Sequence, residues 1–328
     1  MYRPRRRFLR LAAGAAALAA PRIVRAQILR EQIWPAKPIR AMIPFTAGST
    51  LDIIGRIVLD PLAAALGQPI VVENRGGAGG TIGAAAVARA EPDGYTLLIN
   101  ASAHSAAPAA YPNVPYDTAR DFSAVVSFGS VPNVVVISPA KGIRTLKELV
   151  AAAKAGSMTF ASAGVGSATH WAAERLRISA GFQAVHVPFR GGPEAITEVM
   201  TGRVDFYAAG ISSALGFIHD GKVLALAVST PNRTPALPDV PTTIEAGYPD
   251  SDYVFWNGML VPAKTPRDIV DRLHRETQKV LQLPAVQEKL KPQGIDPMPL
   301  TPAEFDALIV KEIASNIAIV KAAGLKFN

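Results

Sequence analysis

The sequence contains no cysteine among its 328 residues. This absence excludes disulfide bonds, thiolate catalysis, cysteine-ligated metal clusters and a lipid-modified N-terminal cysteine. Long apolar runs are also absent, since none reaches the roughly 18 residues that a membrane-spanning helix needs. We therefore expect a globular body that is not held together by covalent cross-links.

Signatures of catalysis are missing as well. There is no Gly-x-Ser-x-Gly elbow and no His-Glu-x-x-His motif. His170 and Glu174, four residues apart on an expected helix, make at most half a metal site, and a solvated or capping pair is the alternative. The other histidines are scattered without an evident nucleophile, at positions His104, His186, His219 and His274. We expect no enzyme, no metal and no cofactor.

The first 26 residues have the layout of an export signal. A basic start precedes a short, weakly apolar stretch at 11–20, and small residues stand at Val24 and Ala26, before a cleavage point after Ala26. Residues 5–9, Arg-Arg-Arg-Phe-Leu, fit the twin-arginine pattern, although Pro4 stands where Ser or Thr is usual. A Sec signal with a basic start is the alternative. Either route predicts a free protein in the periplasm.

The basic character of the chain belongs to this segment. Its removal takes away seven arginines and no acidic residue, which lowers the formal net charge from +8 to +1. No extended Lys/Arg patch remains to neutralise phosphates. Nucleic acid is therefore not an expected partner.

Strand-like and helix-like segments alternate after a short linker. Strands are predicted at 39–45, 70–73, 95–99, 124–128, 134–137, 158–161, 184–188, 204–208, 223–228 and 254–261. Helices are predicted at 51–66, 80–90, 145–155, 169–180, 193–201, 266–281 and 302–323, and the proline-rich segment 229–250 is predicted to be a loop with one short helix. Short apolar strands between helices indicate an α/β fold with a parallel sheet.

Two lobes are the expected arrangement. If the chain crosses between them twice, near 131–138 and 253–258, the last helices return to the first lobe. Such a double crossing forms a hinge, and a ligand then fits between the lobes at the carboxyl ends of the strands.

The stretch VVENRGGAGGTIGAAAVARA, residues 71–90, combines a strand, a glycine turn and a helix. A dinucleotide site would need a third glycine where Ile82 stands, and an acidic residue near Asn100 at the end of the next strand. Both are missing, and no Lys follows the glycines as in a P-loop. The turn therefore either offers backbone amides to an anion or serves close packing and positive φ angles.

Two further strand-to-helix turns carry hydroxyls. They are PFTAGSTLD, residues 44–52, and ASAGVGSATH, residues 161–170. Ser, Thr and Asp at helix starts cap the helix, and free amides there attract anions. Ordinary capping explains either turn alone, whereas one in each lobe favours an anion clamp. Aromatic residues at Phe45, Phe189 and 253–256 supply either an apolar cleft wall or lobe core.

Several collinear motifs resemble one family, the substrate-binding proteins of tripartite tricarboxylate transporters (Bug, TctC-like). The resemblance runs from Trp34 to the C-terminus. It rests on WPAKPIRAMIPFTAGSTLD, LGQPIVVENRGGAGGTIGA, PDGYTLL, YPNVPYDTARDF, VPNVVVISP, VHVPFRGGPEAITEVMTGRVD, ALAVSTPNRTPALPDVPTTIEAG and GIDPMPLTPAEF.

The resemblance implies a two-lobed α/β periplasmic binding protein of the Venus-flytrap, type II-like kind. Residues 34–133 with 256–328 would form lobe 1 and residues 134–255 lobe 2. The implied ligand is a small organic carboxylate, passed to membrane permease subunits, one large and one small, and the receptor would be a monomer. A membrane sensor kinase as partner and an exported, cofactor-binding oxidoreductase are the alternatives.

In the family, the first carboxylate is held by two turns that correspond here to 45–52 and 162–170, partly through water. The candidate ligand-binding residues are Phe45, Thr46, Ala47, Gly48, Ser49, Thr50, Asp52, Ser102, Ser162, Gly164, Gly166, Ser167, His170, Phe189 and Gly210. This chain departs from relatives at 49–51 (Ser-Thr-Leu) and 208–210 (Ala-Ala-Gly). These changes predict a less polar distal pocket that favours a monocarboxylate or aromatic acid over citrate-like or amino-acid ligands.

Overall fold

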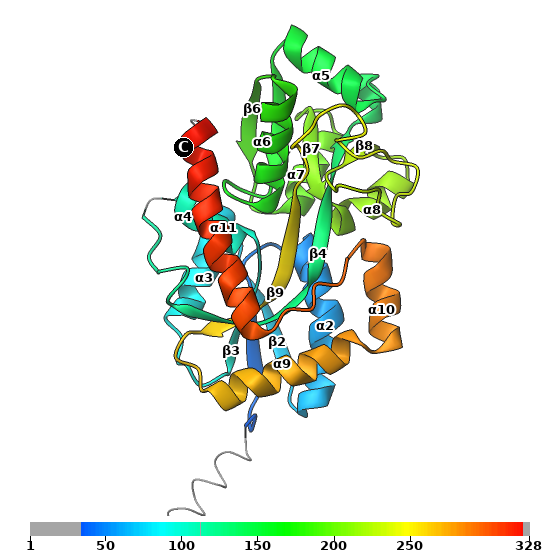
Figure 1. The fold of residues 1–328 in the computed structure, drawn as a ribbon. Helices are drawn as coiled ribbons and strands as arrows, with labels where there is room; N and C mark the ends of the chain where they lie inside the picture. The colour runs from blue at the N-terminus through cyan, green and yellow to red at the C-terminus, as the bar shows by residue number, and fades with distance from the viewer. Residues whose placement is uncertain (1–33, 112, 324–328) are drawn as a thin grey trace, which may run out of the picture.

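The computed structural model describes residues 34–111 and 113–323 (Figure 1). The predicted export signal lies outside them. Among the described residues, no helix is both long and apolar enough to cross a bilayer.

Lobe 1, as we use the term, is built on three parallel strands: β1 (Ile39–Ile43), β2 (Ile70–Asn74) and β3 (Thr96–Ala101). Strand β1 lies between the other two. Its helices in chain order are α2 (Thr50–Leu66), α3 (Thr81–Ala88) and α4 (Ala103–Ala110). Helix α2 buries Ile54, Val58 and Leu62, whose spacing of four places them on one face toward the sheet.

Lobe 2 repeats the scheme. Strand β5 (Met158–Ser162) pairs in parallel with β6 (Ala184–Pro188) and β7 (Phe206–Gly210), and β8 (Leu224–Val228) lies beside β4. Its helices are α5 (Leu146–Ala155), α6 (Ala168–Ala180), α7 (Gly192–Met200) and α8 (Ile211–His219).

Two antiparallel strands connect the lobes. Strand β4 (Phe122–Ile137) pairs with β9 (Val254–Pro262) as far as Pro132, and with β7 from Asn133 onward. All strands therefore form one sheet in the order β2-β1-β3-β9-β4-β7-β5-β6, with β8 on β4. We keep the predicted division into 34–133 with 256–328 and 134–255 as a proposal that agrees with these pairings.

The C-terminal helices contact α2, α4 and β4. They are α9 (Arg267–Leu281), α10 (Pro284–Leu290) and α11 (Pro302–Ala323). Phe305 and Ile309 of α11 join Met42 and Leu98 in a buried cluster, and Figure 1 shows α11 lying along α4.

The structure corrects the predicted elements at several points. The two strands expected at 124–128 and 134–137 are one strand, β4. Its pairing with β9 shifts in register around Ser127–Gly129, where the strand continues without a turn. Helices α4, α8 and α10 are additions to the predicted set. The segment 229–250 forms turns and an isolated bridge to Thr242 in place of the expected short helix.

Candidate functional site

One pocket of about 40 Å³ lies where five helices begin, two from lobe 1 and three from lobe 2. Each of these helices, α2, α4, α6, α7 and α8, follows the carboxyl end of a strand. Residues at their starts meet there because parallel strands bring all their following turns to one edge. The lining consists of Phe45, Ser49, Thr50, Leu51, Ala101, Ala103, Ala163, Ser167, Ala168, Thr169, Gly192, Tyr207, Gly210, Ser213 and Phe255.

The positive electrostatic potential in this pocket comes from backbone N–H groups. The first N–H groups of a helix have no acceptor within the helix, and the helix dipole is positive at that end. Ser49 caps α2 by accepting from the Asp52 N–H (3.3 Å), and Ser167 caps α6 by accepting from the His170 N–H (3.3 Å). Among the described residues, no carboxylate, imidazole, ammonium or guanidinium group lines the pocket. The arrangement attracts an anion without a cationic side chain.

Two further hydroxyl groups of the lining belong to Tyr207 and Thr50. Burial raises the pKa of Tyr207 far above its ordinary value, so its hydroxyl stays protonated, and it is hydrogen-bonded to Thr169. Thr50 is only 7% exposed, and its Oγ1 has no hydrogen-bond partner among the described residues. This oxygen can therefore donate to or accept from a bound molecule.

Asp52 holds the first turn rather than lining the pocket. Its carboxylate accepts from the Gly48 N–H, Arg56 Nε and Asn74 Nδ2, each at 2.9 Å. Asn74 Nδ2 also donates to the Phe45 carbonyl (3.0 Å). These bonds set the path of residues 45–49 and thus the start of α2.

The second turn, residues 163–167, is held by side chains in a similar way. The Ala163 N–H donates to Thr169 Oγ1 (2.9 Å), the Gly164 N–H to Ser162 Oγ (3.0 Å) and the Gly166 N–H to His170 Nδ1 (3.1 Å). Ser162 and His170 are buried behind the turn and lie outside the pocket lining.

The lobes approach each other through glycines. A Cβ at Gly210 would approach Thr50 Cβ to 3.0 Å and overlap its Oγ1, and a Cβ at Gly191 would overlap Thr46 Oγ1. A Cβ at Gly79, whose φ is +60°, would overlap the Val165 carbonyl oxygen. The glycine-rich turn of residues 76–80 therefore lies at the contact between the lobes, where a side chain would hold them apart.

A hydrogen bond spans the same contact. Tyr111 Oη of lobe 1 donates to the Val165 carbonyl of lobe 2 at 2.8 Å. Burial raises the pKa of Tyr111 to about 12, which keeps this donor protonated. Beside it lies a more open hollow of about 460 Å³, lined by Gly77, Ala78, Tyr111, Gly164, Val165, Pro188, Phe189, Arg190 and Glu194.

The predicted ligand-binding residues fall into four groups. The pocket lining contains Phe45, Ser49, Thr50, Ser167 and Gly210. The open hollow at the lobe contact contains Gly164 and Phe189. Thr46 and Gly48 face Gly191 and Pro193 across that contact. The remaining candidates lie outside both linings, at Ala47, Asp52, Ser102, Ser162, Gly166 and His170.

Ser102 illustrates the last group. Its Oγ accepts from the Trp256 N–H (3.0 Å), and its own N–H donates to the Trp256 carbonyl (3.2 Å). These two hydrogen bonds connect the start of α4 to β9, and Ser102 lies outside the pocket lining.

The residues predicted from the sequence do not include the pocket residues at the starts of three helices, Ala103 of α4, Gly192 of α7 and Ser213 of α8. The Gly-Gly-Pro at 191–193 is a recognisable helix-start signal that could have pointed to Gly192. Phe255 belongs to the aromatic segment whose place, cleft wall or core, the sequence leaves open. It lines the pocket, whereas Trp256 is buried against Phe305.

Glu174 is engaged by a neighbouring cation. Arg177 donates to its Oε2 from Nε (3.0 Å) and Nη2 (2.7 Å). Within residues 34–111 and 113–323, no group of three or more His, Asp or Glu side chains could hold a metal ion.

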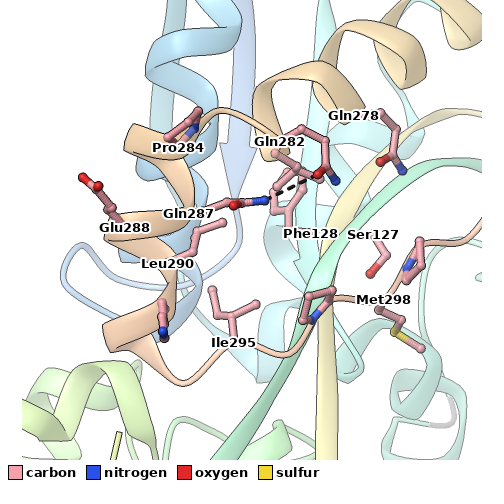
Figure 2. A pocket seen from close by; sticks show the side chains of 14 residues that line it. Ser127, Phe128, Gln278, Gln282, Pro284, Gln287, Glu288, Leu290, Ile295 and Met298 are labelled. Atoms are coloured by element: carbon pink, nitrogen blue, oxygen red, sulfur yellow. Dashed lines mark hydrogen bonds between the residues drawn. The ribbon is translucent and has the colours of Figure 1, made fainter. Parts of the chain in front are cut away.

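A roomier hollow of about 570 Å³ lies elsewhere in lobe 1 (Figure 2). Gln278 and Gln282, at the C-terminal end of α9, border it, and Gln287 Nε2 donates to Gln282 Oε1 (3.4 Å). The carbonyl end of a helix is the negative end of its dipole. The start of α10 at Pro284 and the charged residues Glu288 and Lys291 border it as well, so this hollow carries charges of both signs, in contrast to the smaller pocket.

Residues 54–325 match the family model described as Tripartite tricarboxylate transporter family receptor, TctC. The chain belongs to this family. Protein BugT of Bordetella pertussis strain Tohama I is 34% identical over 300 residues, covering 89% of this chain and 91% of BugT. The solved structure of a periplasmic transporter is 36% identical, with a TM-score of 0.87, over 90% of this chain and 100% of its own.

MatC of Rhodopseudomonas palustris, solved with bound malate, is 30% identical, with a TM-score of 0.83, over 88% of this chain and 100% of its own. These comparisons confirm the predicted family and the α/β fold of periplasmic binding proteins. The TctC receptor is thus a solute-binding component of a transport system, and its function is binding rather than catalysis.

Proposed function

We propose that this TctC receptor binds a small organic carboxylate in the pocket between its lobes and delivers it to a tripartite tricarboxylate-type permease. The observation that carries the proposal is the meeting of five helix starts around a pocket without a charged side chain in its described lining. Such starts bind carboxylates through backbone N–H groups. The relative MatC, which was solved with malate, supports the ligand class.

The two best-defined helix starts suggest how the carboxylate is held. Its oxygens would accept from the first N–H groups of α2, at Thr50 and Leu51, and of α6, at Ala168 and Thr169. Ordered water extends such contacts at little cost. The unpartnered Thr50 Oγ1 supplies a further hydrogen bond.

The rest of the lining supports the predicted preference for an apolar body. Phe45, Leu51, Phe255 and several alanines surround the pocket. The described lining contains no carboxylate with which the ammonium group of an amino acid could pair. Citrate would bring further negative charges without a cationic side chain to meet them. This chemistry favours a compact monocarboxylate or aromatic acid, and because the pocket has a volume of only about 40 Å³, the lobes must move apart to admit either.

Location and partners follow from the same proposal. The signal-like residues 1–26 support export to the periplasm with cleavage near Ala26. A monomer with one solute per pocket would then dock on the large and small membrane subunits of the permease.

Isothermal titration against butyrate, benzoate, malate, adipate, citrate and glutamate tests the proposal. We expect butyrate or benzoate to bind most tightly, and the methyl ester of that acid to lose binding because it cannot form a carboxylate. Exclusive binding of citrate or glutamate would overturn the preference for an apolar body. Failure of every acid, with a flavin or nicotinamide retained by the purified protein, would overturn the carboxylate proposal itself.

The substitution Thr50→Val tests the role of the unpartnered hydroxyl. A hydrogen bond to a charged group contributes about 1.5–3 kcal/mol, so we expect affinity for the best acid to fall at least about tenfold. Thr50→Ser should retain most of the affinity. Neither change should lower the melting temperature of the unliganded protein, because Thr50 Oγ1 has no partner among the described residues to lose.

A further inference from the structure

Two histidine rings stack directly behind the α6 turn. The rings of His170, in the first turn of α6, and His186, on β6, have centroids 3.8 Å apart and planes inclined by 10°. Phe160 of β5 stacks on His186 with a centroid distance of 4.8 Å. Neither histidine lines the pocket.

Each ring is connected to a different backbone N–H of the 163–167 turn. His170 Nδ1 accepts from the Gly166 N–H at 3.1 Å, so Nδ1 carries no proton and the neutral ring bears its proton on Nε2. His186 Nε2 lies 2.6 Å from Ser162 Oγ, which accepts from the Gly164 N–H at 3.0 Å. The pair therefore fixes two amides on the path from β5 to the start of α6.

The contacts require neutral rings. A protonated His170 would turn the Nδ1 acceptor into a donor facing the Gly166 N–H, and two cationic rings 3.8 Å apart would repel each other. The charged groups nearby are Glu174, whose Oε1 lies 3.9 Å from His170 Nε2, and Arg177, which is paired with Glu174. Burial lowers the pKa of both histidines well below the ordinary value, which keeps the rings neutral near pH 7.

We propose that His170 and His186 are positioning residues for solute binding. The hydrogen bonds of His170 to the Gly166 N–H and of His186 to Ser162 set the orientation of the 163–167 amides and of the first turn of α6. They act on the solute through this backbone and do not touch it. The effect on affinity rests on the function proposed above, whereas the fixing of the turn does not.

Two substitutions at His170 separate the hydrogen bond from the stack. His170→Asn keeps an acceptor, since Oδ1 can take the place of Nδ1. His170→Phe keeps a flat ring but removes the acceptor. For the acid of the panel above that binds wild type most tightly, we expect His170→Phe to weaken affinity at least about tenfold and His170→Asn to recover most of it.

His274→Phe is the matched control. The His274 ring sits in lobe 1, with Nδ1 2.7 Å from the Val125 carbonyl oxygen, far from the turn in sequence and outside the pocket lining. We expect it to lower the melting temperature without changing affinity. If His170→Phe does not fold, Ser162→Ala, which removes the acceptor for the Gly164 N–H, should weaken affinity about three- to tenfold.

Nuclear magnetic resonance of ¹⁵N-labelled, unliganded protein tests the turn independently of any solute. We expect a neutral His170 ring protonated on Nε2, and a hydrogen-bonded Gly166 amide shift that is lost in His170→Phe and kept in His170→Asn. A proton on Nδ1, or equal affinities of the Phe and Asn variants, would overturn the inference. If wild type binds no acid of the panel, the proposed function fails, while the Gly166 and His170 signals still decide whether the pair fixes the turn.

Discussion

At Gly210 the backbone of lobe 2 passes so close to Thr50 of lobe 1 that a Cβ would come within 3.0 Å of the Thr50 Cβ. The φ of Gly210 is −60°, so alanine is conformationally allowed there and the obstacle is contact alone. This contact exists only while the lobes are together. A single methyl group at this position would therefore act on closure rather than on the fold of either lobe.

We predict that Gly210→Ala lowers affinity for the best carboxylate at least about tenfold, because the lobes cannot close fully around it. Stopped-flow measurement should show the loss as faster dissociation, with the unliganded melting temperature nearly unchanged. Gly216→Ala, in open space on the helix that follows, is the control. It should leave affinity alone and add about 0.5–1 kcal/mol of stability through helix propensity. Equal affinities of Gly210→Ala and wild type would contradict the close-contact argument.

Residue types alone predict part of the pocket. Ser49 and Ser167 are recognisable because hydroxyl residues cap helices, and both do so here. The orientation of Asp52 is not recognisable, because nothing local indicates that Arg56 and Asn74 both turn toward it. The place of His170 in a strand-to-helix turn marks it as a candidate, but its stacking partner His186 comes from a different strand.

Among the helices and strands, periodicity predicts the long elements and fails where one element follows another without a loop. Helix α8 begins at Ile211, directly after β7 ends at Gly210, so no turn residue marks the junction. Helix α4 begins two residues after β3 and contains Pro108, which argues against a helix on sequence alone. For this reason the sequence predicts helices α2 and α6 but not α4 and α8, although the candidate residues include the N-caps of both missed helices, Ser102 and Gly210.

The start of α2 depends on the carboxylate of Asp52, which receives three donors. Asp52→Asn replaces one acceptor oxygen with a donor, so one of these donors is left facing an N–H. Leaving such a buried group unpaired costs about 1–3 kcal/mol. We predict a loss of this size in urea unfolding, together with weaker carboxylate binding as the 45–49 turn loosens.

Asp60→Asn provides the comparison, since Asp60 lies exposed on the same helix. A surface change of this kind should alter the free energy of unfolding by less than about 0.5 kcal/mol and leave affinity unchanged. If the two Asn variants were equally stable, the anchoring role of Asp52 would be wrong.

For the molecule as a whole, three histidines with lowered pKa values make stability depend on pH. Burial lowers the pKa of His104 to about 4, and it also lowers the pKa values of His170 and His186. The unfolded chain therefore binds more protons than the folded one below about pH 6.5. Stability from these groups is fully present above that pH and is lost as pH falls toward the folded pKa values.

We predict a lower melting temperature at pH 5 than at pH 7.5, with each histidine contributing at most about 1.4 kcal/mol per pH unit in that window. Glu312 and Asp306, whose pKa values burial raises, oppose this trend as they take up protons. Comparing the melting temperatures of wild type and His186→Phe at the same pH values isolates the contribution of His186. The variant should show a shallower decline, and parallel curves would contradict the assignment.

The starts of five helices around one pocket have a consequence for how the cargo of this receptor could change in evolution. In the proposed function most of the attraction for an acid comes from peptide groups, so replacing one side chain weakens that attraction without abolishing it. The side chains that line the rest of the pocket can change while the backbone N–H groups of the helix starts stay the same. Receptors with this architecture can therefore bind chemically different acids through the same backbone N–H groups. The side chains that line the pocket then select among these acids.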